Sequence, residues 1–181
     1  VCAITSEEME SPYIIPEKNA GKYIFMMDPL DGSPNIEVNV SIGTIFSIYR
    51  KKSSGSSVSK DDLLQKGANQ VAGGYIVYGS STMFIYSSGS GVHGFTLDPS
   101  IGEFFLSHPD IKIPAQGNTY SVNEGNQINW NNKQIKLINY FKEFDAVTKR
   151  PYKARYIGSM VSDFHRTLLK GGIFMYPKDS K

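Results

Sequence analysis

Apolar and polar residues near the start of the chain follow a pattern that predicts two strands joined by a tight turn. Residues 22–28 (KYIFMMD) form an apolar run that ends on a carboxylate, and residues 38–49 (VNVSIGTIFSIY) are rich in β-branched and aromatic side chains. Both compositions favour strands. Residues 28–35 (DPLDGSPN) hold two prolines and one glycine, which is the chemistry of a turn.

The middle of the chain has a less regular pattern. The serine-rich residues 51–60 contain few apolar side chains and are expected to form an exposed loop. Asp61 and Asp62 follow this loop and are placed to cap a short helix. Residues 70–85 mix Gly, Ala, Val and Tyr, and this mixture does not separate a strand from a helix.

Two later segments have the apolar spacing of helices. They are residues 135–144 (IKLINYFKEF) and 160–170 (MVSDFHRTLLK), and Gly171 and Gly172 provide a stop after the second. No repeat period and no domain linker is evident, so strands mixed with helices predict a layered α/β or α+β domain. Further short strands are expected at 92–97, 103–106, 119–123 and 173–176.

Composition narrows the class of protein. The chain has 181 residues, of which 40% are hydrophobic, so it has enough apolar material for a core. The formal net charge is +2, which gives no reason to expect a nucleic acid or a membrane surface as a partner. No run of about 18 apolar residues is present, so a transmembrane helix is not expected. A single cysteine, Cys2, excludes an internal disulfide and suits a reducing, cytoplasmic compartment.

The segment Asp28-Pro-Leu-Asp31-Gly32-Ser33 carries the strongest chemical signal. Two carboxylates held close together repel each other unless a proton or a cation lies between them, and Mg²⁺ prefers such oxygen ligands. Gly32 allows a sharp turn, after which the N–H groups of Gly32 and Ser33 are able to face an anion. The segment therefore suits a metal together with a phosphate, although an ordinary acidic surface turn has the same letters.

A second acidic cluster lies at Glu7 and Glu8. These glutamates could complete a two-metal site, or one of them could act as a base on water. A charged loop with no catalytic role is the competing interpretation.

Several segments together resemble one known family. They are residues 6–8 (SEE), 21–52, 67–83 (GANQVAGGYIVYGSSTM), 97–106 (LDPSIGEFFL), 120–126 (YSVNEGN) and 150–177. In order and over essentially the whole chain, they resemble class I fructose-1,6-bisphosphatase. The DPLDGS core is shared with the wider superfamily of Mg²⁺-dependent, lithium-sensitive phosphatases. The resemblance implies the sugar-phosphatase α/β fold, with layered helices and mixed β-sheets.

The resemblance also suggests which part of the family's fold is present. The chain begins at Val1 without a methionine and ends soon after an expected strand. Residues 1–181 are accordingly expected to be the central portion of a fructose-1,6-bisphosphatase domain, without its N-terminal helices and its C-terminal part. Such a piece is expected to be inactive when isolated.

For the reacting centre, the resemblance implies a metal site built from carboxylates. The metal ligands would be Glu7, Asp28, Asp31 and the carbonyl oxygen of Leu30. Glu8 would help to activate the attacking water, so the implied catalytic residues are Glu8, Asp28 and Asp31. The implied cofactor is Mg²⁺, with Mn²⁺ or Zn²⁺ as substitutes.

For the substrate, the resemblance implies contacts along its whole length. Asp31, Gly32 and Ser33 would lie at the 1-phosphate. Arg155 would reach a neighbouring subunit of a homotetramer. Pro34 stands where the family usually has a serine, which removes one N–H and puts the geometry of the phosphate loop in question. The residues implied to bind the sugar and its 6-phosphate are Asn123, Arg155, Tyr156, Ser159, Met160 and Tyr176.

A separate inhibition site for AMP is also implied, with contacts from Lys22, Tyr23 and Arg50. Lys22 and Arg50 end two strands that are expected to be neighbours, so a shared anion site is physically reasonable. Two basic strand ends in solvent are the alternative interpretation.

The activity implied is Mg²⁺-dependent hydrolysis of fructose 1,6-bisphosphate to fructose 6-phosphate and phosphate, a step of gluconeogenesis. A sedoheptulose-1,7-bisphosphatase is the nearest enzymatic alternative. A non-catalytic relative that senses AMP or a sugar phosphate is an alternative of another class, although the presence of Glu7, Glu8, Asp28 and Asp31 together argues against it.

Overall fold

The computed structural model describes residues 1–55 and 57–178 and divides the chain into two compact units. The first unit is Val1–Ile111 and the second is Lys112–Lys181. No linker composition marks this boundary in the sequence, so the hydrophobic pattern alone did not reveal it.

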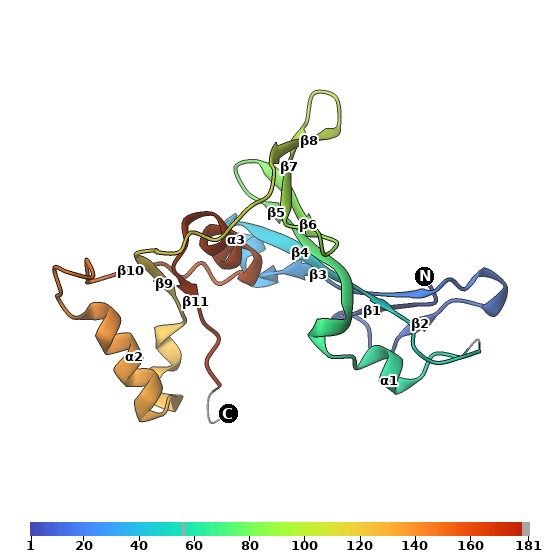
Figure 1. Cartoon of the computed structure of the whole chain (residues 1–181), viewed down its shortest axis with the longest axis horizontal. Coiled ribbons are helices and arrows are strands. Elements are labelled where there is room, and N and C mark those ends of the chain that lie inside the picture. The colour runs from blue at the N-terminus through green and yellow to red at the C-terminus, as the bar shows by residue number, and fades with distance from the viewer. Residues whose placement is uncertain (56, 179–181) are drawn as a thin grey trace. The chain divides into compact units, whose positions relative to one another are not determined.

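The first unit is built on an eight-stranded sheet with the order β2-β1-β3-β4-β5-β6-β7-β8 (Figure 1). β1 and β3 are parallel, and the other neighbouring pairs are antiparallel. The strands are β1 Ala3–Ser6, β2 Tyr13–Ile14, β3 Tyr23–Asp31, β4 Ile42–Arg50, β5 Gln70–Tyr78, β6 Thr82–Ser87, β7 His93–Asp98 and β8 Glu103–His108.

The two strands expected at 22–28 and 38–49 are confirmed as β3 and β4, but their bounds differ from the prediction. β3 continues through Pro29 to Asp31, so the predicted turn at 28–35 was wrong at its start, and the chain leaves the strand only after Asp31. The register of β3 against β4 shifts between Asp28 and Asp31, and a bulge of this kind tolerates a proline within a strand. β4 starts only at Ile42, because the short 3₁₀ helix η2 (Ser33–Val38) comes first.

The ambiguous segment 70–85 forms two strands, β5 and β6. The glycines that obscured its pattern have a packing role. A Cβ on Gly74 would lie 2.3 Å from the Ile85 carbonyl oxygen and 2.8 Å from the Phe46 ring. Gly74 therefore leaves the room that a row of aromatic rings on this face of the sheet requires.

That row of rings crosses several strands. Phe46 stacks near Phe25 with 5.9 Å between ring centroids, and it lies 5.9 Å from Phe84. Phe84 in turn lies 6.2 Å from Phe95 and 6.1 Å from Phe104. Cross-strand aromatic pairs at these spacings stabilise the order of the strands.

The loop expected at 51–60 is mostly exposed among its described residues, and a buried carboxylate anchors it. Asp62, with 1% of its surface exposed, accepts hydrogen bonds from the N–H groups of Lys52 and Ser53, each at 2.8 Å. The hydroxyls of Ser53 and Ser59 donate to the same carboxylate at 2.6 and 2.8 Å. Ser59 caps the short helix α1 (Lys60–Leu63), so the helix expected near Asp61 and Asp62 is confirmed. Gly67–Asn69 form the 3₁₀ helix η3, and Glu17–Asn19 form η1.

The second unit combines a parallel three-stranded sheet with two helices. Its sheet has the order β10-β9-β11, formed by Lys153–Ala154, Thr119–Ser121 and Ile173–Phe174. The helices α2 (Asn132–Lys142) and α3 (Met160–Lys170) confirm both helical predictions, and η4 (Glu124–Asn129) precedes α2. The core cluster consists of Tyr120, Val122, Trp130, Ile138 and Phe141.

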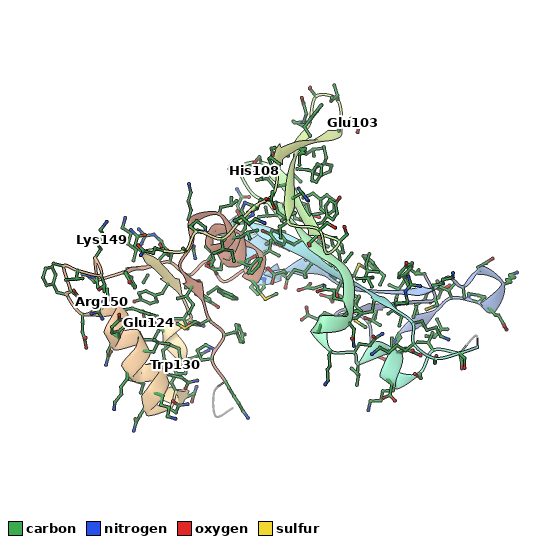
Figure 2. All side chains as sticks on the ribbon, viewed as in Figure 1. Glu103, His108, Glu124, Trp130, Lys149 and Arg150 are labelled. Atoms are coloured by element: carbon green, nitrogen blue, oxygen red, sulfur yellow. The ribbon has the colours of Figure 1, made fainter. Side chains whose placement is uncertain are left out.

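The turn after α2 is fastened by one buried arginine, Arg150 (Figure 2). Its guanidinium donates to the Asp145 carboxylate at 2.8 Å and to the Tyr140 carbonyl oxygen at 2.6 Å. The same group lies 3.6 Å from the centroid of the Tyr140 ring. Arg150 thus closes the loop from residue 143 to residue 150 onto the end of α2. None of the helices formed by residues 1–55 and 57–178 is long and apolar enough to cross a membrane.

Candidate active site

The two aspartates of the DPLDGS segment lie on one face of the large sheet. Asp28 pairs with Ile45 of β4, and Asp31 pairs with Gly43. Ile45 and Gly43 are two residues apart, so they share a face, and directly paired residues share a face with each other. The extra residue in the β3 bulge therefore turns Asp31 to the side of Asp28, where an unbroken strand would place the two on opposite faces.

Glu7 joins this pair through the parallel strand β1. Ser6 is paired with Met27, and the N–H of Glu7 donates to the Met27 carbonyl oxygen at 3.2 Å, so Glu7 lies beside Asp28. Repulsion from Asp28 is the largest cause that raises the pKa of Glu7 above its usual range. A hydrogen bond with Asp28, burial, and the charges of Glu8 and Asp31 act in the same direction. Four carboxylates thus interact at the ends of two neighbouring strands.

Local hydrogen bonds fix the shape of the bulge and the turn after it. The N–H of Leu30 donates to the Asp28 carboxylate at 2.9 Å, which closes a small loop around Pro29. Gly32 has a φ of 81°, a left-handed conformation that favours glycine. Pro34 lies in the first turn of η2, where an N–H has no helical partner to lose. The turn therefore accommodates the proline at this position.

The donor set suits a hard divalent cation. It offers only oxygen ligands, and a cation would relieve the repulsion that raises the pKa of Glu7. In the described part of the chain, however, no three His, Cys, Asp or Glu side chains are arranged as a ready metal cluster. Glu7, Asp28 and Asp31 lie beside one another on the sheet, but their three carboxylates do not converge on a common point.

The residues predicted to bind the sugar and its 6-phosphate lie in the second unit. Asn123 caps η4, because its side-chain oxygen accepts a hydrogen bond from the N–H of Gly125 at 3.1 Å. Arg155 and Tyr156 are exposed on the turn before α3. Ser159 is fully buried and caps α3, and Met160 is the first residue of that helix.

Tyr176 lies at a groove in the second unit. The groove has a volume of about 340 Å³, and Tyr176 is 85% exposed. Its other lining residues are Trp130, Gln134, Leu137, Ile138, Met175 and Pro177. A tyrosine with this exposure is not part of the hydrophobic core, where strand tyrosines are often found.

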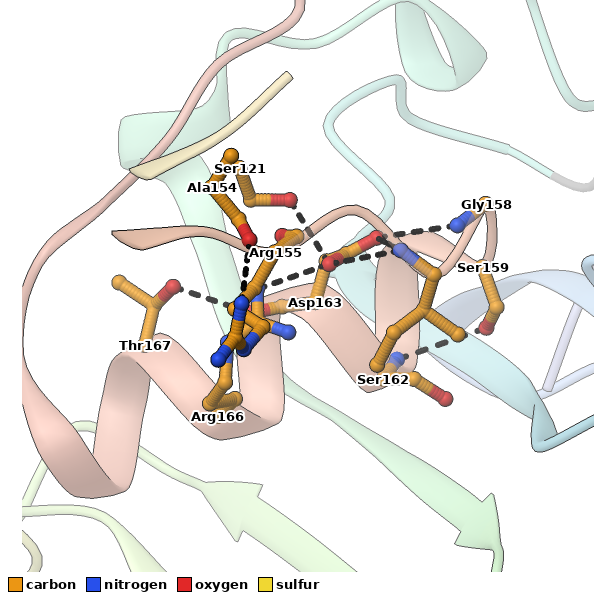
Figure 3. Close-up of polar contacts among 10 residues, drawn as sticks. Ser121, Ala154, Arg155, Gly158, Ser159, Ser162, Asp163, Arg166 and Thr167 are labelled. Carbon is orange, nitrogen blue, oxygen red and sulfur yellow. Dashed lines mark hydrogen bonds and ion pairs between the residues drawn. The ribbon is translucent and has the colours of Figure 1, made fainter. Parts of the chain in front are cut away.

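Sequence reasoning missed one buried acid that organises the turn carrying Arg155. Asp163 has none of its surface exposed, and its carboxylate accepts hydrogen bonds from Ser121, Ile157, Gly158 and Arg166 (Figure 3). An acidic residue in the first turn of a helix was the available signal, but it is also what helix electrostatics alone would favour.

The residues predicted to bind AMP lie together at one end of the β3–β4 pair. Tyr23 is paired with Arg50 across the two strands. The Arg50 guanidinium donates to the Tyr23 hydroxyl at 3.0 Å and lies 5.1 Å from the centroid of its ring. Lys22 is next in sequence and accepts a hydrogen bond at its carbonyl oxygen from the N–H of Lys51 at 2.9 Å. The expectation that these two strands are neighbours is confirmed.

Comparison with known proteins identifies the fold first. The chain is similar to the solved structure of Leishmania major fructose-1,6-bisphosphatase in the T-state, with a TM-score of 0.92 and 48% sequence identity. This match covers 99% of the chain and 56% of the other protein. The fold is that of the lithium-sensitive phosphatase superfamily, with a large mixed sheet and helices, as the sequence predicted.

Family models and curated relatives then identify the family. The model "Fructose-1-6-bisphosphatase, N-terminal domain" matches residues 1–109, and "Fructose-1-6-bisphosphatase, C-terminal domain" matches residues 113–181. The class 1 fructose-1,6-bisphosphatase of Maridesulfovibrio salexigens is 55% identical over 100% of the chain and 54% of its own length. That of Chlorobium phaeobacteroides is 58% identical over 95% of the chain and 52% of its own length.

The chain belongs to the fructose-1,6-bisphosphatase family, which is a family of phosphoric monoester hydrolases. Membership implies a divalent metal cation as cofactor. The chain spans about half the length of the curated relatives it matches. The two family models meet between residues 109 and 113, close to the boundary between the two units.

Proposed function

We propose that the protein to which this chain belongs hydrolyses the 1-phosphate of fructose 1,6-bisphosphate, giving fructose 6-phosphate and phosphate. The reaction is a step of gluconeogenesis, and the single cysteine suits a cytoplasmic location for it. The observation that carries the proposal is the β3 bulge, which turns Asp31 to the face of Asp28 beside Glu7 in a member of this family.

At the reacting end, the carboxylates of Glu7, Asp28 and Asp31 would hold the metal, with the Leu30 carbonyl as a further oxygen. We propose Mg²⁺, with Mn²⁺ or Zn²⁺ as substitutes, since the ligands are all hard oxygen atoms. The bound metal would supply charge neutralisation at the phosphoryl oxygens and an acidified water. Glu8 would accept a proton from that attacking water.

The turn after Asp31 would hold the phosphoryl group during the attack. Backbone N–H groups of Gly32 and Ser33 are the proposed donors to the 1-phosphate oxygens. The left-handed φ of Gly32 supports this role, because such a conformation lets successive N–H groups face an anion. Donors fixed in this way need no rearrangement as negative charge develops.

At the other end of the substrate, the second unit would hold the sugar and the 6-phosphate. Arg155 would form a fork of hydrogen bonds to the phosphate, and Asn123, Tyr156 and Tyr176 would donate to its oxygens. Ser159 and Met160 would contribute backbone groups near the sugar hydroxyls. We further propose a homotetramer in which Arg155 binds the substrate of the neighbouring subunit. The exposed position of its side chain is compatible with this contact.

We also propose that AMP inhibits the enzyme at Lys22, Tyr23 and Arg50. The contact between Tyr23 and Arg50 supports this, because it presents an aromatic face and a guanidinium at one strand end. A nucleotide offers a base that stacks on an aromatic ring and a phosphate that a guanidinium binds.

A chimaera tests the activity directly. These 181 residues replace the matching segment of the Maridesulfovibrio salexigens relative, and phosphate release is measured with fructose 1,6-bisphosphate and with sedoheptulose 1,7-bisphosphate. Metal-dependent turnover with the higher kcat/KM on the fructose substrate is expected, while the 181-residue chain alone is expected to give none. A reversed preference would favour the sedoheptulose enzyme. AMP binding without turnover of either substrate would favour a sensing protein.

A further inference from the structure

We propose that Asp163 is a positioning residue, which fixes the turn from Arg155 to Ser159 so that the exposed Arg155 is held ready for substrate. The inference rests on the proposed function, because it assigns to Asp163 an effect on sugar-phosphate binding. Every residue in the argument belongs to the second unit, and Figure 3 shows Asp163 together with Ser121, Arg155, Gly158, Ser159 and Arg166.

The turn is tied to the Asp163 carboxylate at two successive N–H groups. The Ile157 N–H donates to both carboxylate oxygens at 3.0 and 3.2 Å, and the Gly158 N–H donates at 3.2 Å. Gly158 has a φ of 84°, a left-handed conformation that brings both N–H groups toward the same acceptor. The chain just after Arg155 and Tyr156 is therefore folded around Asp163.

Asp163 also reaches Arg155 itself through a second arginine. One terminal nitrogen of Arg166 donates to the Asp163 carboxylate and to the Arg155 carbonyl oxygen, each at 2.8 Å. The N–H of Arg155 donates to the Tyr120 carbonyl oxygen at 2.9 Å. The backbone of Arg155 is thus held on both sides, while its side chain stays exposed.

A role as the cap of α3 does not explain why a buried aspartate stands at position 163. Ser159 caps α3, since its side chain accepts from the N–H of Ser162, and the N–H of Asp163 is already bonded to the Ser159 carbonyl oxygen at 3.0 Å. The carboxylate instead accepts from the preceding turn, from Arg166 and from the Ser121 hydroxyl at 2.7 Å. A buried carboxylate with this many donors exchanges poorly for an amide, because an amide has one acceptor oxygen and brings an NH₂ donor.

The buried carboxylate of Asp163 is paired with the guanidinium of Arg166. The charge of Asp163 is removed from water, and Arg166 supplies the positive charge that a buried carboxylate needs. Among the described residues, Arg166 Nε is buried and has no hydrogen-bond partner. The hydrogen bonds to Asp163 and to the Arg155 carbonyl oxygen both come from a terminal nitrogen of the guanidinium. Loss of Arg166 would release the Arg155 carbonyl while leaving the two N–H contacts of the turn in place.

Hydrogen exchange of the 181-residue chain tests the structural half of the proposal. In Asp163→Asn, the amides of Ile157 and Gly158 are expected to lose protection. In the matched control Ser121→Ala, which removes one donor to the same carboxylate and leaves the turn intact, both amides are expected to stay protected. Equal protection in Asp163→Asn and the parent chain would overturn the proposal. If Asp163→Asn does not fold, Arg166→Lys is the second variant, because it keeps the positive charge beside the buried carboxylate and loses the guanidinium that also bonds the Arg155 carbonyl oxygen. It is expected to fold and to raise KM.

Kinetics of the chimaera described above test the functional half. Asp163→Asn and Arg166→Lys are expected to raise KM for fructose 1,6-bisphosphate about tenfold with kcat nearly unchanged, since Arg155 meets the substrate away from the reacting phosphate. Ser121→Ala is expected to leave KM unchanged. In an Arg155→Ala background, Asp163→Asn is expected to add little to the increase in KM, because it acts through that arginine.

The outcomes separate this proposal from the proposed function. If Arg155→Ala raises KM but the Asp163 and Arg166 variants do not, or if their effects multiply with that of Arg155→Ala, the positioning role is wrong and the function stands. If the parent chimaera does not hydrolyse fructose 1,6-bisphosphate, the proposed function is wrong. In that case, retained exchange protection in Asp163→Asn would still overturn the structural half.

Discussion

Asp28 and Asp31 are three residues apart in β3, yet their partners Ile45 and Gly43 are only two residues apart in β4. This single extra residue turns both carboxylates to the same face of the sheet and brings them beside Glu7 at the end of β1. A regular strand with the same amino acids would separate them. The bulge is therefore the feature on which the proposed chemistry depends.

A divalent cation should stabilise this arrangement even in the 181-residue chain. We expect Mg²⁺ to raise the free energy of unfolding by about 1.4 kcal/mol at ten times its dissociation constant, because it binds the folded state selectively. Asp28→Asn should abolish this increase, whereas Asp61→Asn, an exposed acid of the same unit, should retain it. Thermal unfolding with and without Mg²⁺ measures the effect. An equal Mg²⁺ effect in Asp28→Asn would argue against the site.

The buried Asp62 should contribute strongly to stability, in contrast to its neighbour in the sequence. Asp62→Ala leaves the N–H groups of Lys52 and Ser53 without their acceptor, so the free energy of unfolding should fall by about 3 kcal/mol. The exposed Asp61→Ala should change it by less than about 0.5 kcal/mol. Urea denaturation of the two variants compares them directly. Similar values for both would contradict the anchoring role given to Asp62.

Asp145 should make the second unit sensitive to acid. The hydrogen bond from Arg150 lowers the pKa of Asp145 to about 2 from an ordinary value of 3.8. A lowered folded-state pKa contributes stability above pH 3.8, and this contribution is lost as the pH falls toward 2. The single tryptophan, Trp130, lies in the second unit, so its fluorescence reports the unfolding of that unit.

The matching experiment follows Trp130 fluorescence in urea between pH 5 and pH 2. In Asp145→Asn, stability should be lower at pH 5 and should depend less steeply on pH across this window. Asp61→Asn in the first unit should leave the pH profile of the second unit unchanged. Parallel profiles for Asp145→Asn and the parent chain would show that the contact with Arg150 does not carry the acid sensitivity.

Inhibition by AMP should depend on Arg50 more than on the Tyr23 hydroxyl. In the chimaera, Arg50→Ala should raise the AMP concentration for half inhibition at least tenfold, since it removes the guanidinium from the strand end. Tyr23→Phe keeps the ring and should have a smaller effect. Lys60→Ala, another exposed basic residue of the first unit, serves as the control. Unchanged inhibition in Arg50→Ala would remove this residue from the proposed AMP site.

Much of the fold followed from hydrophobic pattern, and the exceptions have local causes. β3 and β4 were predicted from runs of apolar, β-branched and aromatic residues, and α2 and α3 were predicted from the helical spacing of their apolar residues. The segment 70–85 was ambiguous because Gly73 and Gly74 dilute the strand pattern, and Gly74 is required by ring packing that no local pattern reveals. The short strands β1, β2 and β10 were missed. The equally short β9 and β11 were expected, because glycines precede their apolar residues and mark where each strand begins.

The candidate site was predictable in its residues but not in its geometry. The letters of DPLDGS suggested paired carboxylates, yet a turn was expected where a bulged strand is found. Pairing with β4 decides between the two, and this is a contact distant in sequence. Asp163 was missed for the same reason, because its donors include Ser121, which is 42 positions away.

The most direct measurement of the central claim is phosphate release from fructose 1,6-bisphosphate by the chimaera carrying Asp28→Asn or Asp31→Asn, with Asp61→Asn as the matched control. If the two bulge carboxylates hold the metal, each of the first two variants should lose at least about a hundredfold in kcat and Asp61→Asn should keep full activity. Retention of near-parental kcat by Asp28→Asn or Asp31→Asn would contradict the account.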